Sequence, residues 1–157
     1  MGLVEYRRRR DFQKSLEPTG NQQERPEAKI YLIHRHDASH LHWDLRLEMD
    51  GVLKSWAVPK EPPTQPGTRR LAVQVEDHPL EYAGFSGVIP EGEYGAGTVE
   101  IWDKGSYTPV SVKEDKLVIM IQGERLNGNY VLVKTKLGGR NNNWLFFMMK
   151  DREEKEV

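Results

Sequence analysis

The sequence predicts a mainly β protein: a compact antiparallel β-barrel, preceded by a short N-terminal helix and an arm. Apolar and polar residues alternate strictly over the nine positions Leu41–Met49, which is typical of a half-buried β-strand. Asp50-Gly51 follows directly, and this dipeptide favours a tight hairpin turn into a partner strand over Val52–Val58. Many further short strand-like segments and little helical periodicity indicate an antiparallel barrel or sandwich.

The two ends of the chain differ from the barrel segment in composition. Leu3–Lys14 is expected to form a short helix. Ser15–Lys29 is polar and contains two prolines, so it is expected to form an arm or loop without regular secondary structure. We therefore assign residues 1–29 to a helix and arm packed on the barrel, and residues 30–150 to the barrel core. Residues 151–157 form a charged tail, and the whole chain is expected to be a single domain.

The segments after the arm are predicted in order along the chain. Strand material begins at Ile30–Ile33 and continues in the hairpin described above. Pro59–Gly67 carries four prolines and is expected to be a loop, and Arg70–His78 alternates again as a strand. The later segments are a turn-rich stretch over Val88–Gly97, strands over Thr98–Trp102 and Leu117–Gln122, a turn at Asn127-Gly128, and strands over Tyr130–Lys136 and Trp144–Met149.

Composition and charge exclude several classes of protein. No apolar run approaches the ~20 residues of a membrane span, so no membrane contact is expected. Without a signal-peptide pattern or any cysteine, the chain fits a cytoplasmic protein. The formal net charge of −1 excludes a generally basic nucleic-acid binder. Attraction to phosphate must then come from local clusters: Arg7–Arg10, Lys60 with Arg69 and Arg70, and Lys134–Arg140.

A cluster of histidines beside a carboxylate predicts a metal site. His42 and Asp44 are two residues apart on one predicted strand, so their side chains point the same way. His36 can reach them from the other side of the intervening turn, and His40 has the right parity but lies nearer that turn. Two imidazoles and one carboxylate that leave coordination positions open suit a catalytic Mn, Fe, Zn or Co ion.

A second polar face is predicted to line the same pocket. Arg46 continues the first face, and Arg70, Glu76 and His78 alternate along the later strand. Arg46 and Arg70 are expected to bind phosphate oxygens, bidentately where the geometry allows, and a cross-strand ion pair is the alternative for Arg70 and Glu76. His78 is expected either to act as a general acid or to hydrogen-bond a phosphoryl oxygen in the transition state, because its imidazole titrates near neutrality. The residues alone leave both roles open.

Two long segments stand out, HDASHLHWDLRLEMDGVLKSWAVPK and RLAVQVEDHPLEYAGFSGVIPEGEYGAG. They closely resemble the 3′-phosphoesterase domain of bacterial DNA ligase D and its stand-alone archaeal homologues. The segments YRRRRDFQKSLEP, GERLNGNYVLVKTK and NNWLFFMMKD are similar to the same family. The resemblance covers nearly the whole chain. It implies a compact β-barrel and a Mn²⁺-dependent activity, with Co²⁺ or another divalent transition metal as an alternative. The resemblance further implies that a 3′-terminal ribonucleoside is removed and that the remaining 3′-phosphate is hydrolysed to a 3′-OH for non-homologous end joining.

The resemblance also implies roles for individual residues. His36, His42 and Asp44 resemble the family's metal ligands, and Arg46 resembles its phosphate-contacting arginine. The sequence differs from the usual family pattern at two positions beside this site. His34 stands where the family usually has glutamine, and His40 where it usually has arginine. Both histidines are expected to alter metal preference or to compete as ligands. The further correspondences are His78 and Tyr82 as active-site residues, Glu76 in the same motif, Lys60 and Arg70 in the phosphate pocket, and Glu17 as a supporting acidic residue.

The expected substrate is the 3′ end of DNA or of an RNA/DNA strand, with a primer–template as the expected context. The sequence contains no ligase or polymerase domain, so a functional partnership with a separate DNA ligase and polymerase is expected, and the chain is expected to be a monomer.

Two other classes fit part of the pattern. An iron-dependent oxygenase would use His42, Asp44 and a later histidine, His78, as its facial triad and would leave His36 out. A non-catalytic nucleic-acid-binding barrel would use tryptophans as stacking platforms. Trp43 is in phase with the apolar residues of its strand, so we expect it to pack in the core instead. The four candidate platforms are Trp43, Trp56, Trp102 and Trp144.

Overall fold

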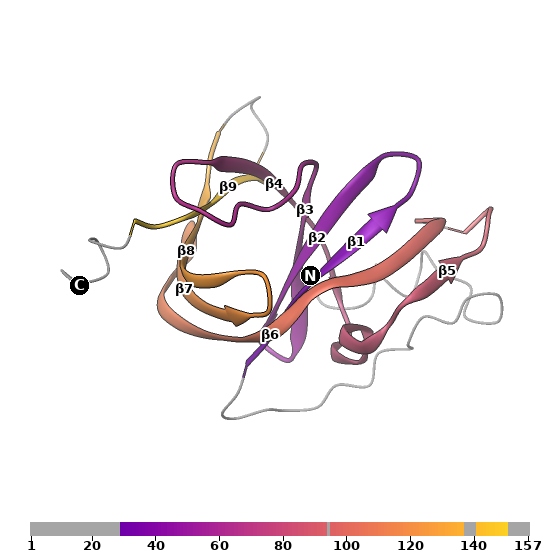
Figure 1. Cartoon of the computed structure of the whole chain (residues 1–157), viewed down its shortest axis with the longest axis horizontal. Coiled ribbons are helices and arrows are strands. Elements are labelled where there is room, and N and C mark those ends of the chain that lie inside the picture. Colours follow the sequence, from indigo (N-terminus) through magenta and orange to yellow (C-terminus); the bar gives the residue numbers. More distant parts are fainter. Residues whose placement is uncertain (1–28, 94, 137–140, 151–157) are drawn as a thin grey trace.

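The computed structural model describes residues 29–93, 95–136 and 141–150, which form nine strands of one antiparallel sheet. Neighbouring strands follow the order β1-β2-β3-β4-β9-β8-β7-β6-β5. Because β1 also pairs with β6, eight strands close into a barrel, and the short β5 adds to β6 beside it (Figure 1). The predicted mainly β barrel is confirmed.

The elements have the following bounds. They are β1 (Lys29–Asp37), β2 (Leu41–Met49), β3 (Val52–Val58), β4 (Arg69–His78), the 3₁₀ turn η1 (Leu80–Gly84), β5 (Gly87–Ile89), β6 (Gly97–Lys113), β7 (Lys116–Gly123), β8 (Asn127–Lys134) and β9 (Asn143–Met148). The predicted N-terminal helix and most of the arm lie outside the described residues, as does the charged tail. Across the described residues, no helix is long and apolar enough to cross a membrane.

The β2–β3 hairpin has the predicted bounds and the predicted turn. Asp50 and Gly51 both have positive φ angles, of 56° and 81°, as a two-residue type I′ turn requires. This turn fixes the register, so Arg46 lies opposite Ser55 and Asp44 opposite Ala57. The hairpin therefore determines which β3 side chains face the polar residues of β2.

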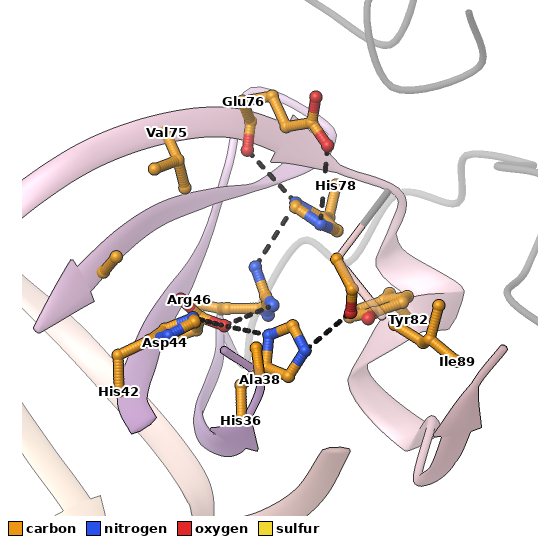
Figure 2. A pocket seen from close by; sticks show the side chains of 12 residues that line it. His36, Ala38, His42, Asp44, Arg46, Val75, Glu76, His78, Tyr82 and Ile89 are labelled. Atoms are coloured by element: carbon orange, nitrogen blue, oxygen red, sulfur yellow. Dashed lines mark hydrogen bonds and ion pairs between the residues drawn. The ribbon is translucent and has the colours of Figure 1, made fainter. Parts of the chain in front are cut away.

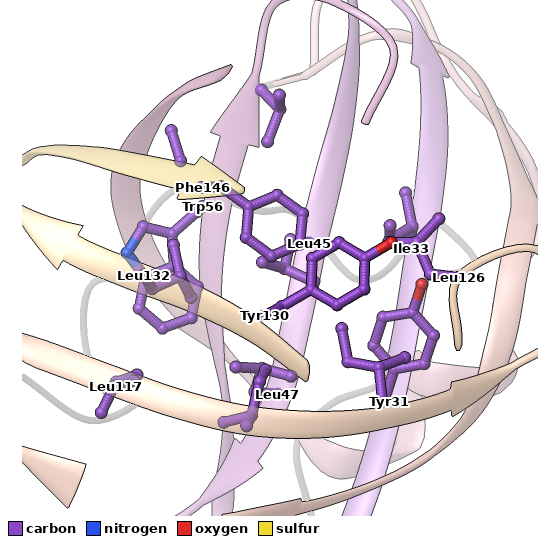
Figure 3. Close-up of a cluster of buried hydrophobic side chains, with 14 of the residues drawn as sticks. Tyr31, Ile33, Leu45, Leu47, Trp56, Leu117, Leu126, Tyr130, Leu132 and Phe146 are labelled. Atoms are coloured by element: carbon purple, nitrogen blue, oxygen red, sulfur yellow. The ribbon is translucent and has the colours of Figure 1, made fainter. Parts of the chain in front are cut away.

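Large apolar side chains fill the interior of the barrel (Figure 3). Trp43, Leu45 and Leu47 of β2 belong to this core, and Trp43 is 9% exposed within it, which confirms its predicted packing role. Each fully buried side chain of this size contributes about 1.5–3 kcal/mol of hydrophobic stabilisation. Its largest fully buried members are Tyr31, Ile33, Leu45, Leu47, Trp56, Ile119, Ile121, Tyr130 and Phe146.

A second apolar cluster lies on the outer face of β1, β3 and β6. Its cover comes from residues 79–93, called here the cover segment, which hold η1 and β5. Leu80, Tyr82, Phe85 and Ile89 of this segment pack with Leu32 and other outward-facing side chains. Asp44, Arg46 and Glu48 of β2 are buried as well, so the strand is buried on both faces over this stretch, and the expectation of a half-buried strand is wrong there.

A β-bulge interrupts the alternation that the sequence predicts for β4. Ser55 of β3 pairs with Val75, whereas Leu53 pairs with His78, so β4 contains one residue more than its partner at this point. Val75 and His78 consequently both line the cavity described below. Arg70 precedes the bulge and pairs with the core residue Phe146, so the predicted common face of Arg70 and His78 is wrong.

The predicted turn at Asn127-Gly128 is also wrong, because both residues belong to β8 and Asn127 pairs with Gln122. The turn lies earlier, where the Gly123 N–H donates to the Leu126 carbonyl at 2.9 Å. The buried carboxylate of Asp103 holds it there. It accepts hydrogen bonds from three successive backbone N–H groups, those of Glu124, Arg125 and Leu126, at 2.8, 2.8 and 3.0 Å.

Candidate active site

The hairpin of β1 and β2 brings the predicted metal ligands together. His36 pairs directly with His42 across the two strands, and Asp44 follows two residues later on the same face of β2. Among the described residues, these three form the group of side chains that could hold a metal ion, and their ligand atoms all lie within 4.8 Å of one another. Asp44 Oδ2 lies 3.2 Å from His42 Nε2 and 3.7 Å from His36 Nδ1.

Backbone carbonyls orient both imidazoles towards Asp44. His36 Nε2 lies 2.7 Å from the Gly95 carbonyl, and His42 Nδ1 lies 3.0 Å from the His40 carbonyl. Because a carbonyl only accepts hydrogen bonds, each of these nitrogens carries a proton and donates it. His36 Nδ1 and His42 Nε2 then point at the Asp44 carboxylate, and each can present a lone pair to a metal ion. The donor set of two imidazoles and one carboxylate therefore fits a transition-metal ion with open positions.

Charges around Asp44 keep its carboxyl group ionised. Burial alone would raise the pKa of Asp44. The Arg46 charge and the hydrogen bonds from His36 and His42 outweigh this effect, so the pKa of Asp44 lies well below its ordinary value. Burial likewise lowers the pKa of His42, but the hydrogen bond and charge of Asp44 outweigh it and raise the pKa overall. The site thus attracts positive charge before any metal ion binds.

Arg46 lies in the centre of this buried network, between Asp44 and His78 (Figure 2). Its Nε donates to His34 Nδ1 at 3.0 Å, and its Nη1 donates to Ser55 Oγ at 2.8 Å. A second Nη1 contact reaches His78 Nδ1 at 3.3 Å, and Nη2 donates to Asp44 Oδ2 at 3.3 Å.

These contacts determine what the Arg46 guanidinium can offer to a substrate. Of its five N–H bonds, those to His34, Ser55 and Asp44 use three, a fourth on Nη1 faces His78 Nδ1, and within the described part of the chain one is left, on Nη2. A bidentate grip on a phosphate, as expected from the sequence, requires one of the internal bonds to be exchanged.

His78 stands between a hydrogen-bond donor and an acceptor. Its Nδ1 lies 3.3 Å from Arg46 Nη1, which can only donate, and 3.1 Å from the Glu76 carbonyl, which can only accept. Its Nε2 lies 4.0 Å from the Glu76 carboxylate. A proton on Nδ1 can be donated to the Glu76 carbonyl, but it prevents Nδ1 from accepting a hydrogen bond from Arg46. A change in the protonation of His78, or the binding of a substrate, can therefore make or break the Arg46–His78 hydrogen bond. This is a suitable position for a group that transfers a proton.

Tyr82 of η1 forms one wall of the site. It is 2% exposed, its ring centroid lies 4.8 Å from that of His78, and Arg46 Cζ lies 4.9 Å from the Tyr82 centroid. The cavity beside these groups has a volume of about 300 Å³. Its lining residues are His36, Ala38, His42, Asp44, Arg46, Ala57, Val75, Glu76, His78, Tyr82, Ile89 and Gly95.

Residues 34–134 match the sequence model of the family described as the DNA ligase D 3′-phosphoesterase domain. The chain belongs to this family. The multifunctional non-homologous end joining protein LigD of Pseudomonas aeruginosa is 46% identical over 162 residues, which cover 99% of this chain and 19% of the relative. The LigD proteins of Mycobacterium tuberculosis H37Rv and Mycolicibacterium smegmatis are 42% and 41% identical, over 99% and 96% of this chain and 21% of each relative.

The chain thus spans about a fifth of the length of the curated relatives that it matches. Membership of the DNA ligase D 3′-phosphoesterase domain family implies a hydrolase that acts on phosphoester bonds. The printed names of the relatives place them in non-homologous end joining, and one of them in DNA repair.

Not every residue predicted for this phosphoesterase site lies in the cavity. Lys60 is exposed, and Arg70 donates its Nε to the Glu61 carbonyl at 2.8 Å; neither lines the cavity. Their contact with phosphate stays a prediction. His40 contributes its carbonyl to His42, while its own side chain is exposed. Glu17 lies outside the described residues.

The two other classes considered from the sequence do not fit the geometry of this candidate site. In the oxygenase alternative His78 would replace His36 as a ligand, but His36 belongs to the metal-binding group, and His78 contacts Arg46 instead. Of the proposed stacking platforms, Trp43, Trp56 and Trp144 are buried in the barrel core. Trp102 is partly buried and lies against Arg125.

Sequence reasoning missed several groups that contact the candidate site residues. Ser55 is fully buried and holds Arg46, and the hairpin register would have predicted this pair, since the two-residue turn places them opposite each other. The Gly95 and Phe85 carbonyls, which contact His36 and His34, gave no signal because any residue carries a carbonyl.

Proposed function

We propose that this chain is a Mn²⁺-dependent DNA 3′-end-healing phosphoesterase. It removes a 3′-terminal ribonucleoside as a phosphodiesterase and then removes the 3′-phosphate as a phosphomonoesterase, leaving a 3′-OH. The observation that carries the proposal is the meeting of His36, His42, Asp44 and Arg46 in one cavity of a chain that belongs to the 3′-phosphoesterase family.

The metal-binding residues would be His36, His42 and Asp44. When bound there, Mn²⁺, or Co²⁺ in its place, supplies positive charge that neutralises the phosphate and polarises its phosphorus–oxygen bonds. The protein keeps the three ligands in place before binding, because carbonyls fix both imidazoles and Arg46 keeps the carboxylate ionised.

Arg46 stabilises the negative charge that develops on the phosphoryl oxygens. Its guanidinium is 3% exposed and is held by His34, Ser55 and Asp44, so it needs little reorganisation during the reaction. The fifth N–H, on Nη2, is the donor for the substrate. Surrounding side chains exclude water from this contact and so strengthen it.

His78 is proposed to work at the leaving oxygen, either by giving it a proton or by donating a hydrogen bond in the transition state. The carboxylate of Glu76 lies 4.0 Å from Nε2 and Arg46 Nη1 lies 3.3 Å from Nδ1, so the ring stands between the two charged groups. Tyr82 holds the His78 ring and the Arg46 guanidinium from the cover segment. In the phosphodiesterase step, the ribose 2′-OH of the terminal nucleotide would add a hydrogen-bonding group to the site.

The proposed substrates are DNA and RNA/DNA 3′ ends at a primer–template. The healed 3′-OH is what a DNA polymerase or ligase extends or seals, so we propose a functional partnership with those two activities in end joining. The basic residues Lys60, Arg69 and Arg70, near the start of β4, would contact the phosphate backbone next to the reacting end.

A labelled duplex tests this proposal. The purified chain is incubated with a 5′-labelled primer–template that carries one 3′-terminal ribonucleotide, with Mn²⁺ or with EDTA, and the product ends are resolved on a denaturing gel. We expect a 3′-phosphate strand first and a 3′-OH strand later, and neither with EDTA. Identical products with EDTA would contradict metal dependence, and no cleavage with Mn²⁺ would contradict the proposed activity.

A further inference from the structure

His34 is a fully buried histidine, and both of its ring nitrogens form hydrogen bonds. Its Nδ1 lies 3.0 Å from Arg46 Nε, and its Nε2 lies 2.9 Å from the Phe85 carbonyl. Arg46 Nε can only donate, and the carbonyl can only accept. The two contacts are therefore satisfied together by one form of the ring: neutral, with its proton on Nε2.

The same contacts keep His34 away from the metal site. A histidine ligand needs a nitrogen lone pair that faces the ion, and the Nδ1 lone pair is taken by Arg46 while Nε2 carries the proton donated to Phe85. The group of potential ligands within the described residues accordingly contains His36, His42 and Asp44 without His34. The expectation from the sequence that His34 competes as a ligand has no support in this geometry.

His34 also joins two parts of the site that are distant in sequence. Arg46 belongs to β2 of the barrel, and Phe85 follows η1 in the cover segment. Phe85 stacks on Tyr82 at a centroid distance of 5.0 Å, and Tyr82 meets the His34 ring edge-on at 5.2 Å. The His34 imidazole therefore fixes the position of the Arg46 guanidinium relative to the Tyr82 ring.

We infer that His34 is a positioning residue: it holds the Arg46 guanidinium through Nδ1 and the cover segment through Nε2, and it does not bind the metal ion. This inference rests on the proposed phosphoesterase function. A glutamine can make both contacts, because its carbonyl oxygen accepts and its NH₂ group donates. Leucine has nearly the volume of glutamine but can make neither contact, so the pair His34→Gln and His34→Leu separates hydrogen bonding from packing.

Nuclear magnetic resonance tests the contacts without any enzymatic assay. In the metal-free, ¹⁵N-labelled full chain, we expect His34 to show a protonated Nε2 and an unprotonated Nδ1, and Arg46 Nε–H to be protected from exchange with water. The protection should persist in His34→Gln and be lost in His34→Leu. A proton on Nδ1 in the wild type would overturn the inference, and this measurement needs no substitution to fold.

Kinetics and metal binding complete the test. With a 3′-phosphate primer, His34→Leu should lower kcat about 10- to 100-fold at nearly unchanged KM, since a small misplacement of Arg46 weakens transition-state stabilisation. His34→Gln should restore most of that loss. Calorimetry should give the same Mn²⁺ affinity for wild type and His34→Leu, and a large loss for His36→Leu.

Each contrary result has a distinct meaning. A loss of Mn²⁺ affinity in His34→Leu that equals the loss in His36→Leu would make His34 a ligand, and equal kcat values for the Gln and Leu variants would exclude a hydrogen-bonding role. An inactive wild type would contradict the proposed function, and the resonance measurements would still decide the role of His34.

Discussion

His36 and His42 lie directly opposite each other on β1 and β2, with their ring centroids 4.8 Å apart and Asp44 Oδ2 close to both rings. The contact between the two imidazole rings, neutral or charged, contributes little stabilisation by itself. The arrangement becomes favourable when the pair and the carboxylate share one cation, and this relationship underlies the predictions on metal binding that follow.

Removal of the single carboxylate ligand should abolish activity. Asp44→Asn keeps the shape of the side chain but removes its charge, so we expect both the phosphodiesterase and the phosphomonoesterase steps to fall below detection and Mn²⁺ binding to weaken strongly. Asp37→Asn, at the exposed end of β1, is the matched control and should behave as the wild type. Wild-type turnover and metal content in Asp44→Asn would exclude Asp44 as a ligand.

Loss of the buried arginine should slow the chemical step. Arg46→Ala is expected to lower kcat by about 10²-fold or more, because a preorganised charge at the transition state contributes several kcal/mol. Arg46→Lys should recover little, since one ammonium group cannot reach His34, Ser55 and Asp44 together. Steady-state rates on a 3′-phosphate end check this, with the exposed Arg35→Ala as control; a lysine variant at the wild-type rate would show that Arg46 only attracts substrate.

The chemistry of the DNA end should decide the rate. A 3′-phosphate places two negative charges beside the metal ligands and Arg46, and a 3′-terminal ribonucleotide adds a 2′-OH, whereas an all-DNA strand with a 3′-OH offers neither. Initial rates should be high on the first two ends and very low on the third. Equal rates on all three ends would indicate a general exonuclease, and fast hydrolysis of a small chromogenic phosphate ester alone would indicate a nonspecific phosphatase.

Asp103 should stabilise the fold without taking part in the reaction. Its carboxylate accepts three backbone N–H groups of the β7–β8 turn and the Tyr31 hydroxyl, at 2.7 Å. Asp103→Asn replaces one acceptor oxygen by a donor, so urea denaturation should show a loss of about 2 kcal/mol or more in the free energy of unfolding. Asp115→Asn, in the exposed β6–β7 turn, should change it little; equal losses would contradict the role of Asp103.

His34 should make the folded protein sensitive to acid. Burial, and then the charge of Arg46, lower its pKa to about 3, while an unfolded histidine has a pKa of about 6.5. Between these values the unfolded chain binds a proton that the folded protein does not, so the free energy of unfolding rises with pH over this range. Urea midpoints from pH 4 to pH 8 should fall less on acidification in His34→Gln than in the wild type, and parallel curves would contradict this.

Local patterns predicted the parts of the structure that depend on neighbouring residues. The β2–β3 hairpin follows from strict alternation and one Asp-Gly turn, and the grouping of His42 with Asp44 follows from their two-residue spacing. His36 joins them because the β1–β2 turn is short enough to place it opposite His42.

Distant contacts explain what the sequence did not predict. The bulge before His78 changes which β4 residues face the cavity, and it therefore separates Arg70 from the site. The β7–β8 turn lies before Asn127 because Asp103, more than twenty residues away in sequence, binds its backbone. Neither the bulge nor the position of this turn changes the local pattern of alternation or of turn residues, so short segments of sequence do not predict them.

The polar face of β2 was predicted correctly in its residues and wrongly in its surroundings. Alternation places Asp44, Arg46 and Glu48 on one face, but it does not show that the cover segment buries that face. This burial lowers the pKa of His34 and shields the Arg46 guanidinium from water, which strengthens its electrostatic interactions.

The most direct test of the account is a crystal structure of the chain with Mn²⁺ and a 3′-phosphate oligonucleotide, with data collected at the manganese absorption edge. We predict one anomalous peak within coordination distance of His36 Nδ1, His42 Nε2 and an Asp44 carboxylate oxygen, with the terminal phosphate next to Arg46. A peak on other residues, such as His78 and Glu76, or a phosphate bound away from Arg46, would contradict it.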